Sequence, residues 1–150
     1  MKVKEIMVKD VDSLKPEENV RTALSLLFKM QISGLPVIDN EGKLVGMFTE
    51  KEVLKNILPS YIEKVGRFVY EENPKSIKKK FEGLSNLSVS QLMRKEVIST
   101  NEDTTLCEVA RIMLIQKVRR LLVVDKSGKV AGIVTRSDIL KALGKEAVNV

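Results

Sequence analysis

The chain has 150 residues, of which 43% are hydrophobic, 31% are charged and none is histidine. This composition supports one ordinary domain or two very small ones and excludes a disordered chain. No apolar run approaches the ~20 residues of a membrane span, and the N-terminal segment lacks a signal-peptide pattern, so we expect a cytoplasmic protein with no membrane association. A single cysteine, Cys107, cannot form an internal disulfide. Without histidine, zinc sites and Ser-His or Cys-His catalysis lose their usual groups, so we expect no catalytic residues, no metal site and no enzyme.

The formal net charge of +6 is unevenly distributed along the chain. Residues 1–54 carry a net charge of −1, residues 55–88 carry +3 and residues 89–150 carry +4. An anion would therefore be attracted to the second half, although a solvated lysine-rich surface accounts for the same pattern. The Lys- and Glu-rich composition is also typical of thermophilic proteins.

The sequence repeats itself after a displacement of 86 residues, without a gap from Val3/Val89 to Leu54/Leu140. The matched positions include turn glycines and core residues: Met7/Met93, Val37/Val123, Gly42/Gly128, Gly46/Gly132 and Thr49/Thr135. We therefore predict one repeat over residues 1–54, an insert over 55–88 and a second repeat over 89–150.

Each repeat predicts the order strand, helix, strand, strand, helix. In the first repeat a short strand at 10–14 precedes a helix at 20–30, strands at 35–38 and 44–48 around a turn at 39–42, and a helix after Thr49. In the second repeat the strand lies at 96–100, the helix at 106–118, the paired strands at 121–124 and 130–134, and the last helix after Thr135. Thr105 and Glu108 predict a capping box at the start of the 106–118 helix.

The insert predicts two short helices that pack on the repeats or on a second subunit. Ser60 and Glu63 have capping-box spacing, and apolar residues at 61, 62, 65, 68 and 69 share one helical face. Ile77, Phe81 and Leu84 form a second stripe after Asn73-Pro74. The Lys78–Lys80 run is typical of a solvated helix face, and nucleic acid or anionic lipid is the alternative partner.

Fifty residues bury too little surface to be stable alone. We therefore predict an α+β fold in which the two repeats pack sheet to sheet about an approximate two-fold axis. Such an arrangement leaves paired clefts between the repeats, and clefts of this kind favour ligand binding.

The tract Gly132–Leu140 and its partner Gly46–Leu54 hold the candidate site. In each, a strand ends in threonine and a helix begins with an acidic residue three positions later. Amides at the helix start can hold a phosphate, the acid can accept from ribose hydroxyls, and Arg136 can pair with phosphate. The same spacing is also that of a capping box needing no ligand, which spacing alone favours. Since Glu52 is the usual capping acid and Asp138 is shorter, ligand binding is favoured around Asp138.

These segments resemble a tandem pair of cystathionine β-synthase (CBS) domains, often called a Bateman module. The resemblance rests on residues 35–39 (LPVID) with 42–49 (GKLVGMFT), and on residues 121–125 (LLVVD) with 128–138 (GKVAGIVTRSD). It covers residues 1–54 and 89–143 and leaves the insert outside. Leu122 departs from the proline usual at this place, which Pro36 keeps.

The resemblance implies a regulatory sensor that binds AMP, ADP, ATP or S-adenosylmethionine between the repeats, requires no cofactor, and forms disc-like head-to-head or head-to-tail homodimers. It implies that Thr135 and Asp138 hold phosphate and ribose, whereas Glu52 in place of aspartate puts ribose binding beside Thr49 in doubt. The implied clefts each draw on both repeats. The stronger one comprises Thr135, Arg136, Asp138, Asp12, Ile32, Ser33 and Gly34, and the weaker one comprises Thr49, Glu52, Ile98, Val118, Arg119 and Arg120.

Three functions remain open from the sequence. The first is an adenosine-ligand sensor that acts on a dimer or on a separate, unknown partner protein. The second is a nucleic-acid-binding protein that uses the basic second half, with Lys78–Lys80 and Arg119-Arg120. The third is a ligand-free interaction scaffold in which the threonine–acid pairs are only helix caps.

Overall fold

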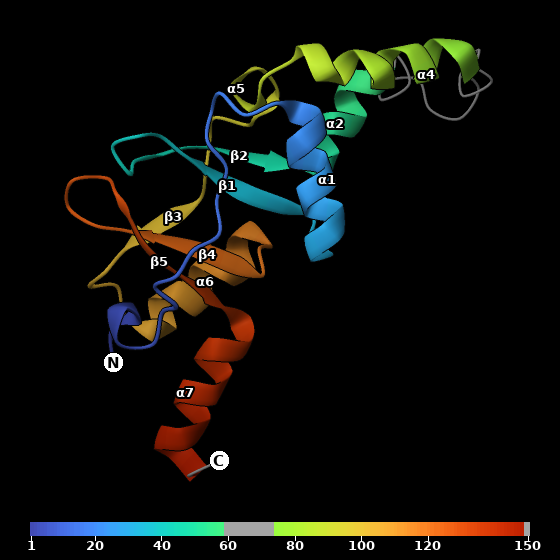
Figure 1. Ribbon diagram of the computed structural model, residues 1–150. Coiled ribbons are helices and arrows are strands. Elements are labelled where there is room, and N and C mark those ends of the chain that lie inside the picture. The colour runs from blue at the N-terminus through green and yellow to red at the C-terminus, as the bar shows by residue number, and fades with distance from the viewer. Residues whose placement is uncertain (59–73, 149–150) are drawn as a thin grey trace. The chain divides into compact units, whose positions relative to one another are not determined.

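The computed structural model describes residues 1–58 and 74–148 (Figure 1). The predicted Ser60–Glu63 capping box and the apolar stripe over residues 61–69 lie outside these ranges. The chain divides into two compact units. Unit 1 comprises Met1–Asp12, Asn40–Leu44 and Val97–Val150, and unit 2 comprises Ser13–Asp39 and Val45–Glu96. Each unit thus combines most of one repeat with the N-terminal segment of the other.

Unit 2 is built around a two-stranded sheet of β1 (Gly34–Ile38) and β2 (Leu44–Thr49), whose first residue, Leu44, is assigned to unit 1. The helices are α1 (Val20–Met30), α2 (Glu50–Ile57), α4 (Pro74–Glu82) and α5 (Val89–Leu92), with a 3₁₀ turn, η3, at Gly83–Asn86. The predicted strand at 10–14 is wrong, because only Leu14 pairs there, in a single parallel bridge to Val37. The second predicted insert helix is confirmed by α4.

Unit 1 contains a three-stranded sheet in the order β3-β4-β5, formed by β3 (Ser99–Asn101), β4 (Arg120–Val124) and β5 (Val130–Thr135). β3 is parallel to β4, and β4 is antiparallel to β5. The helices are α6 (Leu106–Gln116) and α7 (Arg136–Val148), and a 3₁₀ turn, η1, covers Val3–Glu5. Together the two units confirm the α+β class and the predicted element order of the second repeat.

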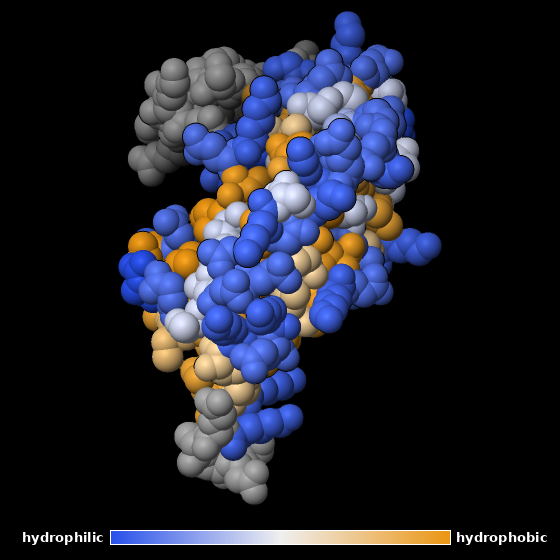
Figure 2. All heavy atoms as spheres, turned by 90° about the vertical axis from the view of Figure 1, so that its left-hand side faces the viewer, coloured by the Kyte–Doolittle hydropathy of each residue, from blue (hydrophilic) through white to orange (hydrophobic). Residues whose placement is uncertain are grey.

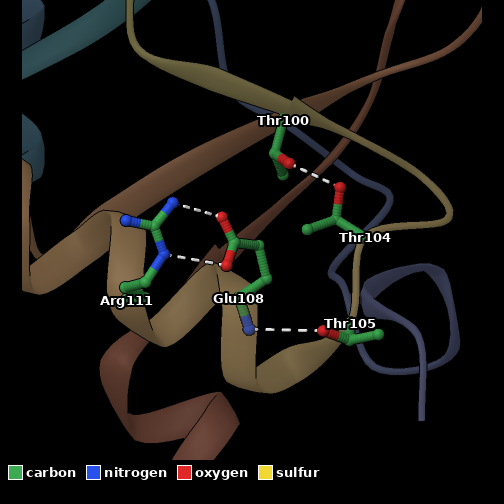
Figure 3. Close-up of polar contacts among 5 residues, drawn as sticks. All are labelled: Thr100, Thr104, Thr105, Glu108 and Arg111. Atoms are coloured by element: carbon green, nitrogen blue, oxygen red, sulfur yellow. Dashed lines mark hydrogen bonds and ion pairs between the residues drawn. The ribbon is translucent and has the colours of Figure 1, made fainter.

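The polar contacts at the start of α6 correct one local prediction (Figure 3). The Thr105 hydroxyl accepts from the Glu108 amide at 3.3 Å, as in a capping box. The Glu108 carboxylate instead accepts two hydrogen bonds from the Arg111 guanidinium, at 2.6 and 2.9 Å. This pairing holds the pKa of Glu108 below its usual value. The reciprocal half of the predicted box is therefore replaced by an ion pair one helical turn away.

Each unit has its own hydrophobic core, completed by a segment from the other repeat. Val89 of the second repeat, together with Leu84 of the insert, is fully buried with residues of α1, β1, β2 and α2 in unit 2. Val3 is fully buried with residues of α6, β4, β5 and α7 in unit 1. The two units make equivalent contacts. Val8 forms an isolated β-bridge to Ile133 in unit 1, and Arg94 forms one to Met47 in unit 2. Val8 and Arg94 are 86 residues apart, and so are Met47 and Ile133.

Both hairpin turns contain a glycine with positive φ, 84° at Gly42 and 86° at Gly128, a conformation that other residues rarely adopt. Hydrophilic side chains dominate the face drawn in Figure 2, and apolar side chains show between them. None of the helices in the described ranges has the length and apolarity that a bilayer crossing requires.

Candidate functional site

The threonine–acid pair at the start of α7 forms a complete capping box. The Asp138 amide donates to Thr135 Oγ1 at 3.2 Å, and the Thr135 amide donates to Asp138 Oδ2 at 2.9 Å. Both hydrogen bonds are partly buried. No hydrogen bond from the described part of the chain reaches the second carboxylate oxygen, Oδ1. The cap therefore uses one carboxylate oxygen and leaves the other for a hydroxyl donor.

The equivalent pair in the first repeat forms only half a box. The Glu52 amide donates to Thr49 Oγ1 at 3.4 Å, and within the described residues the Glu52 carboxylate accepts no hydrogen bond. The expectation that glutamate would be the capping acid and aspartate the ligand acid is therefore wrong in its first part. The shorter side chain of Asp138 reaches its own helix cap, whereas Glu52 does not.

The amides at the helix starts are less available than the sequence suggests. The Arg136 amide donates to the Arg119 carbonyl at 3.2 Å, and the equivalent Glu50 amide donates to the Ser33 carbonyl at 2.9 Å. Since the third amide of each helix donates to threonine, only the second amide, of Ser137 or Lys51, has no acceptor among the described residues. A phosphate at either helix start would thus need side-chain cations as well.

Two arginines lie at the start of α7. Arg120 lies directly opposite Thr135 in the β4–β5 pairing, so the two side chains are cross-strand neighbours. The Arg136 Nε atom donates to the Val118 carbonyl at 3.3 Å. Both Arg120 and Arg136 are exposed. The equivalent positions in the first repeat are Gly34 and Glu50, so the helix start beside Thr49 lacks the two arginines found beside Thr135.

The sequence assigned Arg136 to the stronger cleft with Thr135, but Arg119 and Arg120 to the weaker cleft beside Thr49. The structure instead places Arg120 opposite Thr135, and the Arg119 carbonyl accepts from the Arg136 amide. Unit 1 contains Asp12, Ile98, Val118, Arg119, Arg120 and the Thr135–Asp138 pair, whereas unit 2 contains Ile32, Ser33, Gly34, Thr49 and Glu52. A Cβ atom on Gly34 would lie 2.7 Å from the Thr49 Cγ2 atom, so these two residues are in direct contact. The proposed clefts between repeats stay predictions.

Asp138 also lines a pocket of about 360 Å³ in unit 1, which the sequence did not reveal. Its other lining residues are Met1, Ile6, Lys141, Ala142 and Lys145. The helical spacing from Asp138 to Lys141 and Lys145 was a readable signal, because residues at i, i+3 and i+7 share one helix face. The pocket volume lies within the range of small-molecule sites, about 300–1,000 Å³.

The remaining candidate groups are the basic runs and the cysteine. Lys78–Lys80 are exposed on α4 in unit 2, and Arg119-Arg120 lie in unit 1. Cys107 is an exposed free thiol on α6. Among the described residues, no group of three or more cysteine, aspartate or glutamate side chains could hold a metal ion.

Comparison with known proteins identifies the family. The sequence profile described as "CBS domain" matches residues 3–59 and 89–145. The chain belongs to the CBS domain family. The two matches coincide with the two repeats, so this chain is a CBS-domain pair.

Curated relatives of the CBS-domain pair include short and long proteins. Uncharacterized protein MJ1426 of Methanocaldococcus jannaschii is 31% identical over 156 residues, covering 95% of this chain and 91% of that protein. Inosine-5'-monophosphate dehydrogenase of the same organism is 33% identical over 140 residues, covering 93% of this chain but 23% of the enzyme. The similarity to the enzyme is therefore confined to about a quarter of its length.

Solved structures of CBS-domain pairs share this fold. CBSX2 from Arabidopsis thaliana has a TM-score of 0.75 and 28% identity, with 99% of this chain and 98% of that chain covered. CBSX2 in complex with AMP has a TM-score of 0.71 and 29% identity, with 97% of both chains covered.

Proposed function

We propose that this CBS-domain pair is a regulatory module that binds an adenine nucleotide, with no catalytic step of its own. The observation that carries the proposal is the arrangement at the start of α7. There Asp138 has one carboxylate oxygen with no hydrogen bond among the described residues, Arg120 is the cross-strand neighbour of Thr135, and Arg136 begins the helix. A carboxylate can accept hydrogen bonds from ribose hydroxyls, and a guanidinium pairs with phosphate through two hydrogen bonds. The AMP complex of the similar protein CBSX2 supports the same ligand class.

Phosphate-bearing nucleotides are preferred over S-adenosylmethionine in this proposal. The arginines beside Thr135 offer guanidinium donors for phosphate, and S-adenosylmethionine has no phosphate to accept them. The half-formed cap at Thr49, with Glu50 and Gly34 in place of arginines, predicts a second site of lower affinity. AMP, ADP and ATP remain the candidate ligands.

Ligand-induced change in the melting temperature tests the proposal. Wild type is measured with AMP, ADP, ATP and S-adenosylmethionine, since a ligand that binds only the folded state raises the midpoint. Asp138→Asn is the informative variant, because an amide oxygen can still cap Thr135 while the second acceptor is lost. Loss of a hydrogen bond to a charged group, about 1.5–3 kcal/mol, predicts roughly 10- to 150-fold weaker binding.

Glu52→Gln is the matched control in the first repeat. Because the higher-affinity site is the one at Asp138, this variant should show the same nucleotide-induced rise in melting temperature as wild type. If none of the nucleotides shifts the wild-type midpoint at millimolar concentration, the sensor proposal is wrong and the scaffold alternative stands. If Asp138→Asn responds as wild type does, the ribose assignment is wrong.

The module is also proposed to act as a homodimer, through helix faces that both repeats leave exposed. In unit 2, Phe28 on α1 and Leu54 on α2 are 59% and 53% exposed. Their equivalents in unit 1, Leu114 on α6 and Leu140 on α7, are both 70% exposed. Large apolar side chains exposed at equivalent positions of both repeats favour burial against another protein surface. Nucleotide occupancy would then act on this dimer or on a separate partner protein.

A further inference from the structure

We propose that the pocket bordered by Asp138 in unit 1 is a second ligand site, separate from the proposed nucleotide site, and that it binds a small phosphate monoester with an apolar body. All of its lining residues belong to unit 1, where one face of α7 lies against the N-terminal segment that contains η1. Asp138 borders both sites, but the groups that would hold this ligand are ones that the nucleotide proposal does not use.

The pocket walls combine apolar surface with two positive charges. Met1, Ile6 and Ala142 supply the apolar surface, and Lys141 and Lys145 supply two ammonium groups. The volume of about 360 Å³ lies within the range of small-molecule sites, about 300–1,000 Å³. A ligand that fits these walls has an apolar body and a negatively charged group.

The two lysines lack a counter-charge within the described part of the chain. Both are exposed, and neither forms an ion pair there. Lysines four positions apart on a helix are neighbours and repel each other. Lys145 lies in the last turn of α7, where a cation is favourable in any helix, but Lys141 lies in the middle of the helix and has no such reason to be there. An anion shared by the two ammonium groups would remove the repulsion.

A phosphate monoester matches this pair of charges, because it carries close to two negative charges at neutral pH. Charge-assisted hydrogen bonds from two ammonium groups to its oxygens would hold it at the lysine end of the pocket. At 1.5 Å per residue, Lys141 and Lys145 lie about 4.5 and 10.5 Å from Asp138 along the axis of α7. The Asp138 carboxylate repels a phosphate at its own end, so the two ends of the pocket orient the ligand.

The first repeat does not contain this pair of lysines. The equivalents of Lys141 and Lys145 in the first repeat are Lys55 and Pro59. The repeated architecture therefore does not require two lysines on this helix face. Lys55 also provides a matched control, since it is a lysine at the same position of the other repeat.

Titration of the full chain with phenyl phosphate, followed by the backbone amide signals in two-dimensional NMR, tests the inference. We expect saturable shifts at Ile6, Lys141 and Ala142. Lys141→Gln and Lys145→Gln should each weaken binding by about tenfold, because each removes a hydrogen bond to a charged group. Lys55→Gln should bind phenyl phosphate as wild type does. Shifts that do not saturate, or an affinity that neither Lys141→Gln nor Lys145→Gln lowers, would overturn the inference.

Two comparisons separate a pocket from a charged surface. Ala142→Leu should abolish binding, because the larger side chain fills the pocket while the charge stays the same, and thermal unfolding checks that the variant folds. Inorganic phosphate should bind wild type at least about tenfold more weakly than phenyl phosphate, because it buries no apolar surface. If folded Ala142→Leu binds as wild type does, or if the two phosphates bind equally well, the lysines attract anions without a pocket and the inference is wrong.

The response to AMP shows whether the two sites are separate. Lys141→Gln should keep the wild-type rise in melting temperature with AMP, because the proposed nucleotide groups are Asp138, Arg120 and Arg136. If Lys141→Gln loses the responses to both AMP and phenyl phosphate, the pocket is part of the nucleotide site and the inference of a second site is overturned. A wild type that binds phenyl phosphate but no nucleotide would refute the nucleotide proposal and leave the second site standing.

Discussion

The packing of each repeat's N-terminal segment on the other repeat's sheet predicts that Gly132 cannot be replaced by alanine. A Cβ atom on Gly132 would lie 2.7 Å from the Met7 Sδ atom and 2.9 Å from the Val8 carbonyl oxygen. The Met7 thioether can move, but the Val8 backbone is fixed by two hydrogen bonds. The Val8 carbonyl accepts from the Ile133 amide at 2.9 Å, and the Val8 amide donates to the Ile133 carbonyl at 2.9 Å. Relief of the clash must therefore strain a backbone bridge as well as a side chain.

The expected cost of Gly132→Ala follows from these two contributions. Overpacking a buried position costs about 1–3 kcal/mol, and each strained backbone hydrogen bond contributes about 1 kcal/mol more. The sum is about 2–5 kcal/mol, a large part of a typical folding free energy of about 5–15 kcal/mol. For a chain of this size we expect a melting temperature lower by roughly 5–20 °C. Urea unfolding followed by circular dichroism gives the free energy directly.

Two further variants make the test specific. Gly83→Ala is the control, because a Cβ atom there has no neighbour within 4 Å, and its free energy of unfolding should stay within about 0.5 kcal/mol of wild type. Met7→Ala removes the sulfur contact, so the cost of Gly132→Ala should be smaller in the Met7→Ala background. If the two substitutions are additive, or if Gly132→Ala is as stable as wild type, the proposed packing of Met7 on Gly132 is refuted.

Two other predictions concern helix caps and pH. Without ligand, Asp138→Ala should lower the free energy of unfolding by about 1 kcal/mol, because the helix cap is lost. Glu52→Ala should stay within about 0.5 kcal/mol of wild type, because Glu52 does not complete its cap. Urea unfolding measures both, and equal losses would contradict the two cap geometries. Hydrogen bonding to Lys4 holds the pKa of Asp103 below its usual value, so the contribution of Asp103 to stability is present above that usual value and is lost on acidification. Asp103→Asn should therefore lose less stability than wild type between pH 7 and pH 3, and an unchanged acid dependence would show that the pair is absent in solution.

Much of the fold could be predicted because the relevant signals are local. The helical spacing of five residues predicts one apolar face: Val20, Ala23, Leu24, Leu27 and Met30. The structure buries the first four, and Met30 packs partly buried against the same core. The turn glycines at 42 and 128 have the positive φ that the hairpins require. The strand predicted at 10–14 failed for a different reason, since a strand needs a partner in register and local composition does not supply one.

The sequence by itself determined that two similar halves exist, which elements each contains, and that a threonine and an acid begin the last helix of each. Only the tertiary structure decided that Asp138 rather than Glu52 completes its cap, and that Arg120 lies opposite Thr135. It also decided that Met7 packs on Gly132, 125 positions later in the chain. The physical reason is the distance along the sequence over which each feature is decided. Helical periodicity and helix caps depend on residues within a few positions of one another in the chain. Strand register, side-chain reach and the choice of packing partner depend on groups that only folding brings together.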